Sequence, residues 1–327
     1  MPRGHSGLKK AQAGGMGPDG GERGLPSRHR RSVDARTSPR NRTIHAPRPP
    51  SIPPVPKRQR SHGIVDLHVG PAGIGGPTRV RDLAEAGPAR IRFPREAGTM
   101  EGILVNTAGG IACGDDFAIS ARLDPGADLV LTSVAAEKVY RSDGPISTVR
   151  NGFTLGSAAR LAWLPQETIL FDGARLRRRL EADLAEDAAL LLVEIVAFGR
   201  AARDETLTEA LFEDVWRVRR GGRLVFADTV RFDGAVGAAL SRAAIGGGAR
   251  TMGTILDCAP GAEARIEEAR ACLDAAIAGG GIEAAASAWN GHLTLRLLGA
   301  EVGALRGVVA RFLAVYRGAP MPRVWQT

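Results

Sequence analysis

Residues 176–184 read LRRRLEADL, and residues 188–198 read AALLLVEIVAF. In the first stretch the apolar residues at 176, 180, 182 and 184 alternate with charged ones, and Arg178 alone breaks the apolar series. A period of two is typical of a strand with one buried face. The second stretch is apolar on both faces apart from Glu194, which favours a strand covered on both sides.

The same alternation extends along the chain on either side of this pair. In two further stretches, apolar residues fall on every second position or on the same alternating series. They are Phe117, Ile119, Ala121 and Leu123 in the first stretch, and Leu224, Phe226, Val230 and Phe232 in the second. Turn sequences separate the stretches, at 124–126 (DPG), 142–145 (SDGP), 171–173 (FDG) and 220–222 (RGG). Such punctuation between short alternating runs predicts many short strands.

Helical spacing appears late in the sequence. Apolar residues recur at 266, 269, 273 and 276, after Pro260 and Gly261, and again at 302, 305, 309, 312 and 316, before Gly318. The two patterns predict two amphipathic helices. We therefore expect a mainly β, sandwich-like body flanked by about two helices. The sequence has no fixed-period repeat, so it does not by itself demonstrate a regular solenoid.

Composition divides the chain at about residue 60. Residues 1–60 hold 14 Lys and Arg against 3 Asp and Glu, ten of the 20 prolines and none of the aromatic residues. This leaves 30 basic and 32 acidic residues in 61–327, so the first segment carries a charge of +11 and the rest −2, which together give the net charge of +9. We expect residues 1–60 to be a disordered basic tail and residues 61–327 to form one domain.

The tail allows two interpretations. In the first, its arginine runs bind an anionic partner. In the second, it has no binding role and is either a solvated extension or upstream sequence translated from a wrongly chosen start codon. It has no aromatic residue to stack on a base and no apolar region of a secretory signal, so we favour the second interpretation. We expect neither a nucleic-acid partner nor a membrane, because the chain also has no apolar run of spanning length.

Several enzyme and metal classes find no support in the sequence. It contains no P-loop, no HExxH and no GxSxG motif, so nucleotide hydrolysis and two common hydrolase types are not indicated. Cys113, Cys258 and Cys272 are far apart, and four of the six histidines lie in or beside the tail. We therefore expect no tight metal site, and we interpret His68 and His292 as ordinary surface or core residues.

Five short segments carry a more specific signal. They are NTAGG at 106–110 followed by GD at 114–115, KVYRS at 138–142, WLPQE at 163–167, GRAARDE at 199–205, and PRVW at 322–325. Gly109, Gly110 and Gly114 allow positive φ or close backbone approach. In this order and spacing the segments resemble the urease accessory proteins of the D type (UreD, also called UreH). The resemblance covers about residues 61–327 and departs from the family pattern at Cys113 and Glu137.

The resemblance implies a cytoplasmic urease maturation factor that is not an enzyme. Proteins of this family bind the urease apoprotein and a helical accessory protein of the F type, and through it a nickel-binding GTPase of the G type. Together they help to deliver nickel to the dinickel site of urease. The family fold is a strand-rich, β-helix-like body flanked by two helices, with a proposed water-filled nickel route. The resemblance therefore implies no tightly bound cofactor, with Ni²⁺ passing in transit.

Nickel in transit needs weak ligands, because a tight His and Cys cage would trap a metal that stands high in the Irving–Williams order. Carboxylates suit this task. Our candidates for the nickel route are Asp115, Glu167, Glu194 and Glu205, three of which lie in the matched motifs. Glu194 interrupts an apolar run, where a carboxylate is costly to bury unless it is paired or solvated. The alternative for Glu194 is an ion pair with an arginine such as Arg200.

The other motif residues also have structural interpretations. Tyr140 and Arg141, next to Lys138, could anchor a turn or face a partner, and we favour the turn. We expect Trp163 and Trp216 in the core, and we expect Trp325 to pin the C-terminal segment to the body or to a partner. One alternative function is a β-structured hydrolase that pairs Asp115 or Asp116 with Glu167. A nucleic-acid-binding protein working through the tail ranks third.

Overall fold

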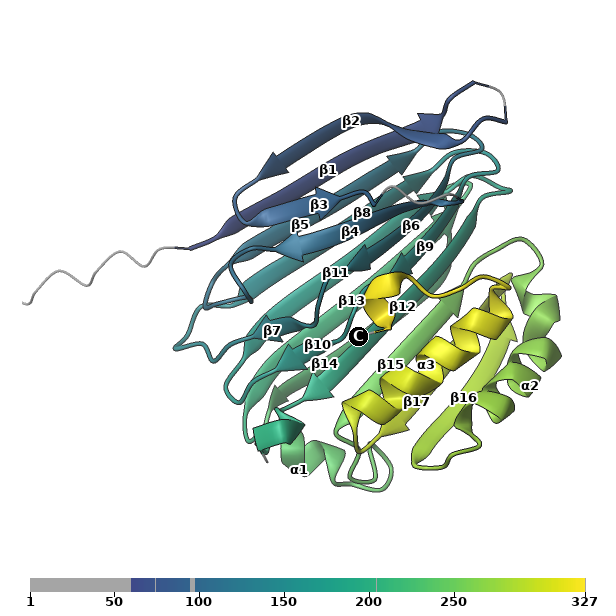
Figure 1. Ribbon diagram of the computed structural model, residues 1–327. Coiled ribbons are helices and arrows are strands. Elements are labelled where there is room, and N and C mark those ends of the chain that lie inside the picture. Colours follow the sequence, from purple (N-terminus) through teal and green to yellow (C-terminus); the bar gives the residue numbers. More distant parts are fainter. Residues whose placement is uncertain (1–59, 74, 95–97, 204, 327) are drawn as a thin grey trace, which may run out of the picture. The chain divides into compact units, whose positions relative to one another are not determined.

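The computed structural model describes residues 60–73, 75–94, 98–203 and 205–326. The expected tail, residues 1–60, lies outside these residues except for Arg60. Within them the chain forms two β-sheets and three α-helices (Figure 1). None of these helices is long and apolar enough to cross a membrane.

We call the seven-stranded sheet sheet A. In spatial order it contains β14 (Arg223–Gly234), β13 (Ala210–Arg220), β11 (Arg175–Leu184), β8 (Ser147–Leu155), β5 (Asp116–Leu123), β1 (His62–Pro71) and β2 (Thr78–Ala86). The five central strands pair in parallel, and the two edge strands, β2 and β14, pair antiparallel.

Sheet B has a continuous path and a short side branch. Along the path lie β16 (Ile282–Trp289), β17 (His292–Gly299), β15 (Thr251–Asp257), β12 (Ala189–Phe198), β9 (Arg160–Leu164), β6 (Asp128–Ser133), β4 (Met100–Asn106) and β3 (Ala89–Arg92). The branch consists of β10 (Thr168–Leu170), which pairs with β12, and β7 (Glu137–Val139), which pairs with β10.

The chain alternates between the sheets as it coils. It passes from β5 in sheet A to β6 in sheet B, then to β8, β9, β11, β12 and β13 in turn. Each coil thus adds one parallel strand to each sheet, which is a solenoid-like arrangement. Successive strands of sheet A begin at Asp116, Ser147, Arg175 and Ala210. The coils therefore differ in length, which explains why the sequence shows no fixed period.

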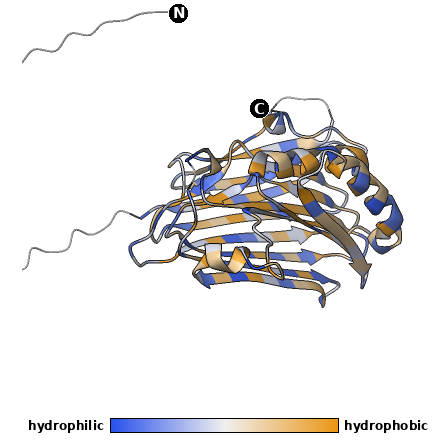
Figure 2. Ribbon diagram, turned by 90° about the horizontal axis from the view of Figure 1, so that it is seen from below, coloured by the Kyte–Doolittle hydropathy of each residue, from blue (hydrophilic) through white to orange (hydrophobic). Residues whose placement is uncertain are grey.

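Two apolar layers hold the body together. One lies between the sheets and contains Leu180 and Phe212 of sheet A and Leu192 of sheet B. The other lies between sheet B and the helices α2 (Ile266–Ile277) and α3 (Val302–Tyr316), and it contains Val193 and Phe312. β12 contributes alternate residues to both layers, as its continuous apolar run predicts. Figure 2 shows the alternating hydrophobic and hydrophilic residues along the strands.

These features confirm the predicted fold class. The two expected helices are present, and Trp163 and Trp216 are buried in the core as predicted. The sequence patterns missed α1 (Val236–Leu240) and the short 3₁₀ turns Ala201–Arg203, Ala262–Arg265 and Arg323–Trp325. One parity assignment was wrong: Leu224 is 50% exposed. A register shift between Val218 and Arg219 in the partner strand displaces it from the buried series.

Candidate functional site

The glycine-rich loop after β4 closes against the segment around β7. Gly110 has φ of +152°, and a Cβ there would lie 2.5 Å from the ring of Tyr140 and 2.8 Å from the carbonyl oxygen of Lys138. Only glycine fits this approach. The amide of Asn106, the last residue of β4, donates to the carbonyl oxygen of Gly110 at 3.2 Å. The loop therefore holds the ends of β4 and β7 together.

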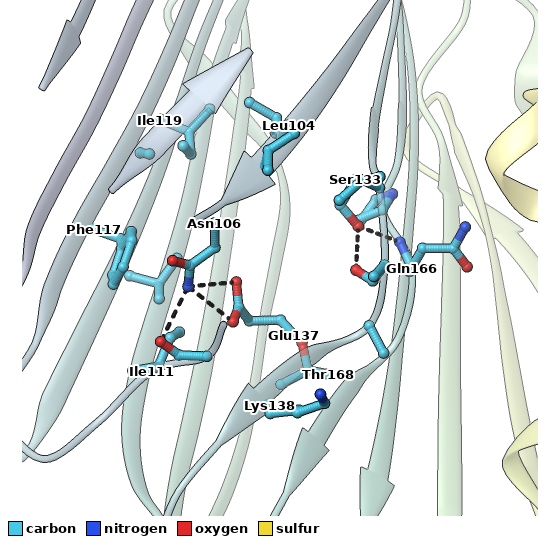
Figure 3. A pocket seen from close by; sticks show the side chains of 18 of the residues that line it. Leu104, Asn106, Ile111, Phe117, Ile119, Ser133, Glu137, Lys138, Gln166 and Thr168 are labelled. Carbon is cyan, nitrogen blue, oxygen red and sulfur yellow. Dashed lines mark hydrogen bonds between the residues drawn. The ribbon is translucent and has the colours of Figure 1, made fainter. Parts of the chain in front are cut away.

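A cavity of about 220 Å³ opens beside this loop, and residues of β4 and β6 and of the side branch formed by β7 and β10 line it (Figure 3). Apolar side chains from both sheets form most of its wall, including Leu104, Phe117, Ile119, Val149 and Leu176. Its polar lining falls into two groups. Asn106, Glu137 and Lys138 lie together on the loop side, and the other polar lining residues are Arg90, Ser133, Asn151, Trp163, Gln166, Thr168, Arg178 and Glu194.

Glu137 is the acidic group on the loop side of the cavity. The amide of Asn106 donates to both of its carboxylate oxygens, at 3.1 and 3.3 Å (Figure 3). Burial raises the pKa of Glu137 to about 7, although the hydrogen bond from Asn106 and the charge of Lys138 act in the opposite direction. At neutral pH this carboxyl group is therefore divided between its neutral and charged forms.

Glu194 is the acidic group among the core residues. It is 4% exposed, and it accepts a hydrogen bond from the indole Nε1 of Trp163 at 2.9 Å. Its ion-pair partner is Arg178, which also binds Asp214. The alternative of an ion pair with an arginine is therefore confirmed, but the arginine is Arg178; Arg200, which we gave as the example, binds Glu205 at 2.7 Å. Burial raises the pKa of Glu194, since the charge of Arg178 offsets only part of its lost hydration.

The other three nickel-route candidates lie outside the cavity lining. Asp115 is buried and accepts backbone N–H groups of Ser61 and Ala112, at 2.7 and 2.8 Å. Its carboxylate thus fixes the end of the glycine-rich loop. Glu167 lies 3.7 Å from the guanidinium Nε of Arg306. Among the four candidates, the cavity contains Glu194 alone.

Tyr140 and Arg141 make the turn contacts that we favoured. The hydroxyl of Tyr140 donates to the carbonyl oxygen of Gly109 at 3.1 Å, and Arg141 pairs with Asp172. The ring of Tyr140 meets that of Phe171 edge to face, with centroids 5.0 Å apart. The guanidinium of Arg200 stacks 4.2 Å from the centre of the Phe171 ring. Three of the matched segments therefore meet on one surface near the loop.

The last matched segment is attached to the body. Trp325 is 4% exposed, and its Nε1 donates to the carbonyl oxygen of Leu164 at 3.0 Å. The amide of Gln166 donates to the carbonyl oxygen of Val324 at 2.7 Å. The Trp325 side chain therefore pins the C-terminal segment to the body, which was one of the two expectations.

The carboxylates of the alternative hydrolase have separate partners. Asp116 binds Arg150 through two hydrogen bonds, at 2.7 and 2.8 Å, while Asp115 binds backbone N–H groups and Glu167 lies beside Arg306. An acid and base pair must flank one substrate bond. In the structure, Asp115, Asp116 and Glu167 do not form such an acid and base pair.

Sequence reasoning missed three residues of the site. Glu137 was noticed only as a departure from the family pattern, and Asp214 was not singled out. Arg178 was recorded as the one misfit on an apolar face. The one signal in the sequence was that two opposite charges, Arg178 and Glu194, interrupt the buried faces of consecutive strands; it indicates that each needs a buried partner but does not fix which side chains meet.

The fold and the cavity define a solenoid-like β protein with a largely apolar pocket between its two sheets, into which a few polar and charged side chains are set. The chain belongs to the UreD urease accessory protein family, which it matches over residues 61–326. The resemblance seen in five short segments is thereby confirmed, and the protein has the role of a urease accessory protein.

Named relatives agree with this assignment. The chain is 64% identical over 282 residues to urease accessory protein UreD 1 of Methylobacterium radiotolerans, covering 86% of this chain and 98% of that protein. It is 61% identical over 278 residues to UreD 2 of Methylorubrum populi, covering 84% and 93%. It is 51% identical over 270 residues to UreD of Xanthobacter autotrophicus, covering 83% and 91%.

Proposed function

We propose that this protein is a non-catalytic urease maturation factor of the cytoplasm. It binds the urease apoprotein and, together with accessory proteins of the F and G types, helps to deliver nickel to the dinickel site of urease. The observation that carries the proposal is the cavity between the sheets. Three of the five matched segments, those at 106–110, 138–142 and 163–167, contribute to its lining, and Glu137 and Glu194 supply its carboxylates.

The cavity chemistry suits a metal ion that must be released again. Its side-chain oxygen groups are two carboxylates, the amides of Asn106, Asn151 and Gln166 and the hydroxyls of Ser133 and Thr168, set in an apolar wall. Oxygen ligands bind Ni²⁺ more weakly than a His and Cys cage would. The side-chain oxygen Oδ1 of Asn151 is buried and accepts no hydrogen bond in the structure, so it is available to a hydrated cation.

Asp115, Glu167 and Glu205 remain part of the proposal in a different role. Each lies in a matched segment and contacts a neighbouring segment or partner outside the cavity. We assign them to shaping the surface that partner proteins meet. The charged Lys138, which lines the cavity and is exposed, would face a docked partner.

Urease activation in cells tests the proposal. Cells express the matching urease operon with this gene intact, deleted, or carrying Glu137→Gln or Glu194→Gln, across a series of nickel concentrations. We expect deletion to abolish activation, and each variant to require more nickel while still recovering the apoprotein and the F-type protein in pull-downs. The matched control is Glu181→Gln, which alters an exposed carboxylate paired with Arg179 outside the cavity. Full urease activity without the gene at limiting nickel would refute the proposal.

A further inference from the structure

Three charged side chains cluster beside the cavity. Arg178 of β11 lies between Asp214 of β13 and Glu194 of β12, and all three are at least nine-tenths buried. Its guanidinium reaches Asp214 through two groups, Nε to Oδ1 at 3.0 Å and NH2 to Oδ2 at 2.6 Å. It reaches Glu194 through NH1 alone, and the same group also donates to Thr168. Asp214 is therefore the firm anchor, and Glu194 is the partner more easily released.

The cluster has an unbalanced charge. Two carboxylates face one guanidinium, so the fully ionised group carries one excess negative charge in a site shielded from solvent. Arg178 and Glu194 line the cavity, whereas Asp214 does not. The unpartnered, buried Oδ1 of Asn151 lies in the same lining. The excess negative charge of the cluster would thus attract a cation that enters the cavity, although the guanidinium of Arg178 already occupies that end.

Polar contacts continue past the cluster toward the edge of the sandwich. Thr254 of β15 is the register partner of Glu194, and Arg296 of β17 is the register partner of Thr254. The Oγ1 of Thr254 accepts a hydrogen bond from Arg296 at 2.6 Å, and Arg296 also pairs with Asp228 of β14. The side chains of Arg296 and Asp228 are 39% and 25% exposed. None of Thr254, Arg296 and Asp228 belongs to the cavity lining.

We propose that Arg178 is a gate between the cavity and this polar row. Anchored on Asp214, its guanidinium closes the inner end of the cavity by holding Glu194, and a divalent cation that takes the Glu194 carboxylate releases it. The inference rests on the proposed nickel route and assigns the step that controls it. A guanidinium repels cations at close range, so no cation passes while the Arg178–Glu194 pair is intact.

Cysteine accessibility tests the gate without relying on urease. Thr254→Cys reports the far side of the gate, and Val149→Cys reports the cavity itself, each in the full chain carrying Cys113→Ser and Cys272→Ser. The rate of reaction with a small cationic methanethiosulfonate is measured with the gate intact and in the variant Arg178→Met/Asp214→Asn. Arg178→Lys serves as a milder variant, because it retains the charge but not the two-sided fork.

We expect the thiol introduced at position 149 to react at a similar rate in every background. The thiol introduced at position 254 should react about tenfold faster or more once the gate is opened. Arg178→Lys should give an intermediate rate at position 254, and the control Arg200→Met, which breaks an ion pair outside the cavity, should change neither rate.

A divalent cation provides a second readout of the same gate. Mn²⁺, an ion that prefers oxygen ligands, should accelerate the reaction of the thiol at position 254 when the gate residues are native, but not when Glu194→Gln is present. Equal reaction rates at position 254 with and without Arg178 would overturn the gate.

The urease assay separates the two proposals. If the Arg178 variants expose the thiol at position 254 while urease activation keeps its nickel dependence, the gate stands and the nickel route through it fails. If that thiol stays protected in variants that lower activation, the gate fails and the proposed function remains.

Discussion

Glu137→Gln isolates the cost of burying a carboxylate in the cavity. The structure raises the pKa of Glu137 from its ordinary 4.5 to about 7, so the folded protein prefers the neutral form. A carboxyl group with a raised pKa lowers stability as pH increases through the interval between the two values. One pKa unit is worth about 1.4 kcal/mol, which gives a penalty of about 3 kcal/mol at pH 8 and less than about 1 kcal/mol at pH 5.

The glutamine side chain is uncharged and can still accept the hydrogen bond from Asn106. We therefore expect the unfolding free energy of the variant to exceed that of the unmodified protein by about 3 kcal/mol at pH 8, and by much less at pH 5. Urea denaturation at several pH values between 5 and 8 measures the difference. Glu205→Gln is the control of opposite sign, because Arg200 holds the pKa of Glu205 below its usual range. A constant offset between the two Glu137 curves across this pH range would refute the reasoning.

Three further perturbations test other contacts. His292 is buried without a partner for either ring nitrogen, and burial lowers its pKa. Stability should therefore fall as pH drops below about 6.5, a dependence that thermal melts of His292→Leu should lack. Trp163→Phe removes the N–H donor to Glu194 and should cost about 1–3 kcal/mol in urea unfolding, while an unchanged midpoint would count against that bond. Trp325→Ala should cost about 3 kcal/mol and increase proteolysis near the C-terminal end, and equal protease resistance would contradict its pinning role.

Local sequence patterns predicted where the strands lie better than they predicted which strands pack against one another. The alternation in residues 176–184 and the apolar run in residues 188–198 correspond to β11 and β12. Periodicity reports which face of a strand is buried but not which strand lies opposite. Arg178 and Glu194 were each recognised as exceptions, yet their pairing depends on consecutive strands entering different sheets. A contact between two sheets has no fixed spacing in the sequence.

The cavity was equally hidden from the sequence. It exists because β7 and β10 leave the path of sheet B, and that branch is set by pairings between distant segments. Glu137 gains its burial from this branch and its hydrogen bonds from Asn106, thirty-one residues away in sequence. Asp115, in contrast, precedes a strand after a glycine-rich turn, and its contact with the backbone N–H of Ala112 is local, whereas its contact with Ser61 is again between distant segments.

The coiling of the chain sets the order in which it can assemble. During synthesis each new coil can dock on the one before it. In sheet A, one parallel neighbour of each of β5, β8 and β11 precedes it in the chain: β1, β5 and β8, respectively. β12 is different, because the side that carries Val193 is covered by α3 and by other residues near the C-terminal end. An incomplete chain would present this apolar side to solvent and to other nascent chains. Late ribosomal arrest or premature termination should therefore yield an aggregation-prone intermediate that needs chaperone protection.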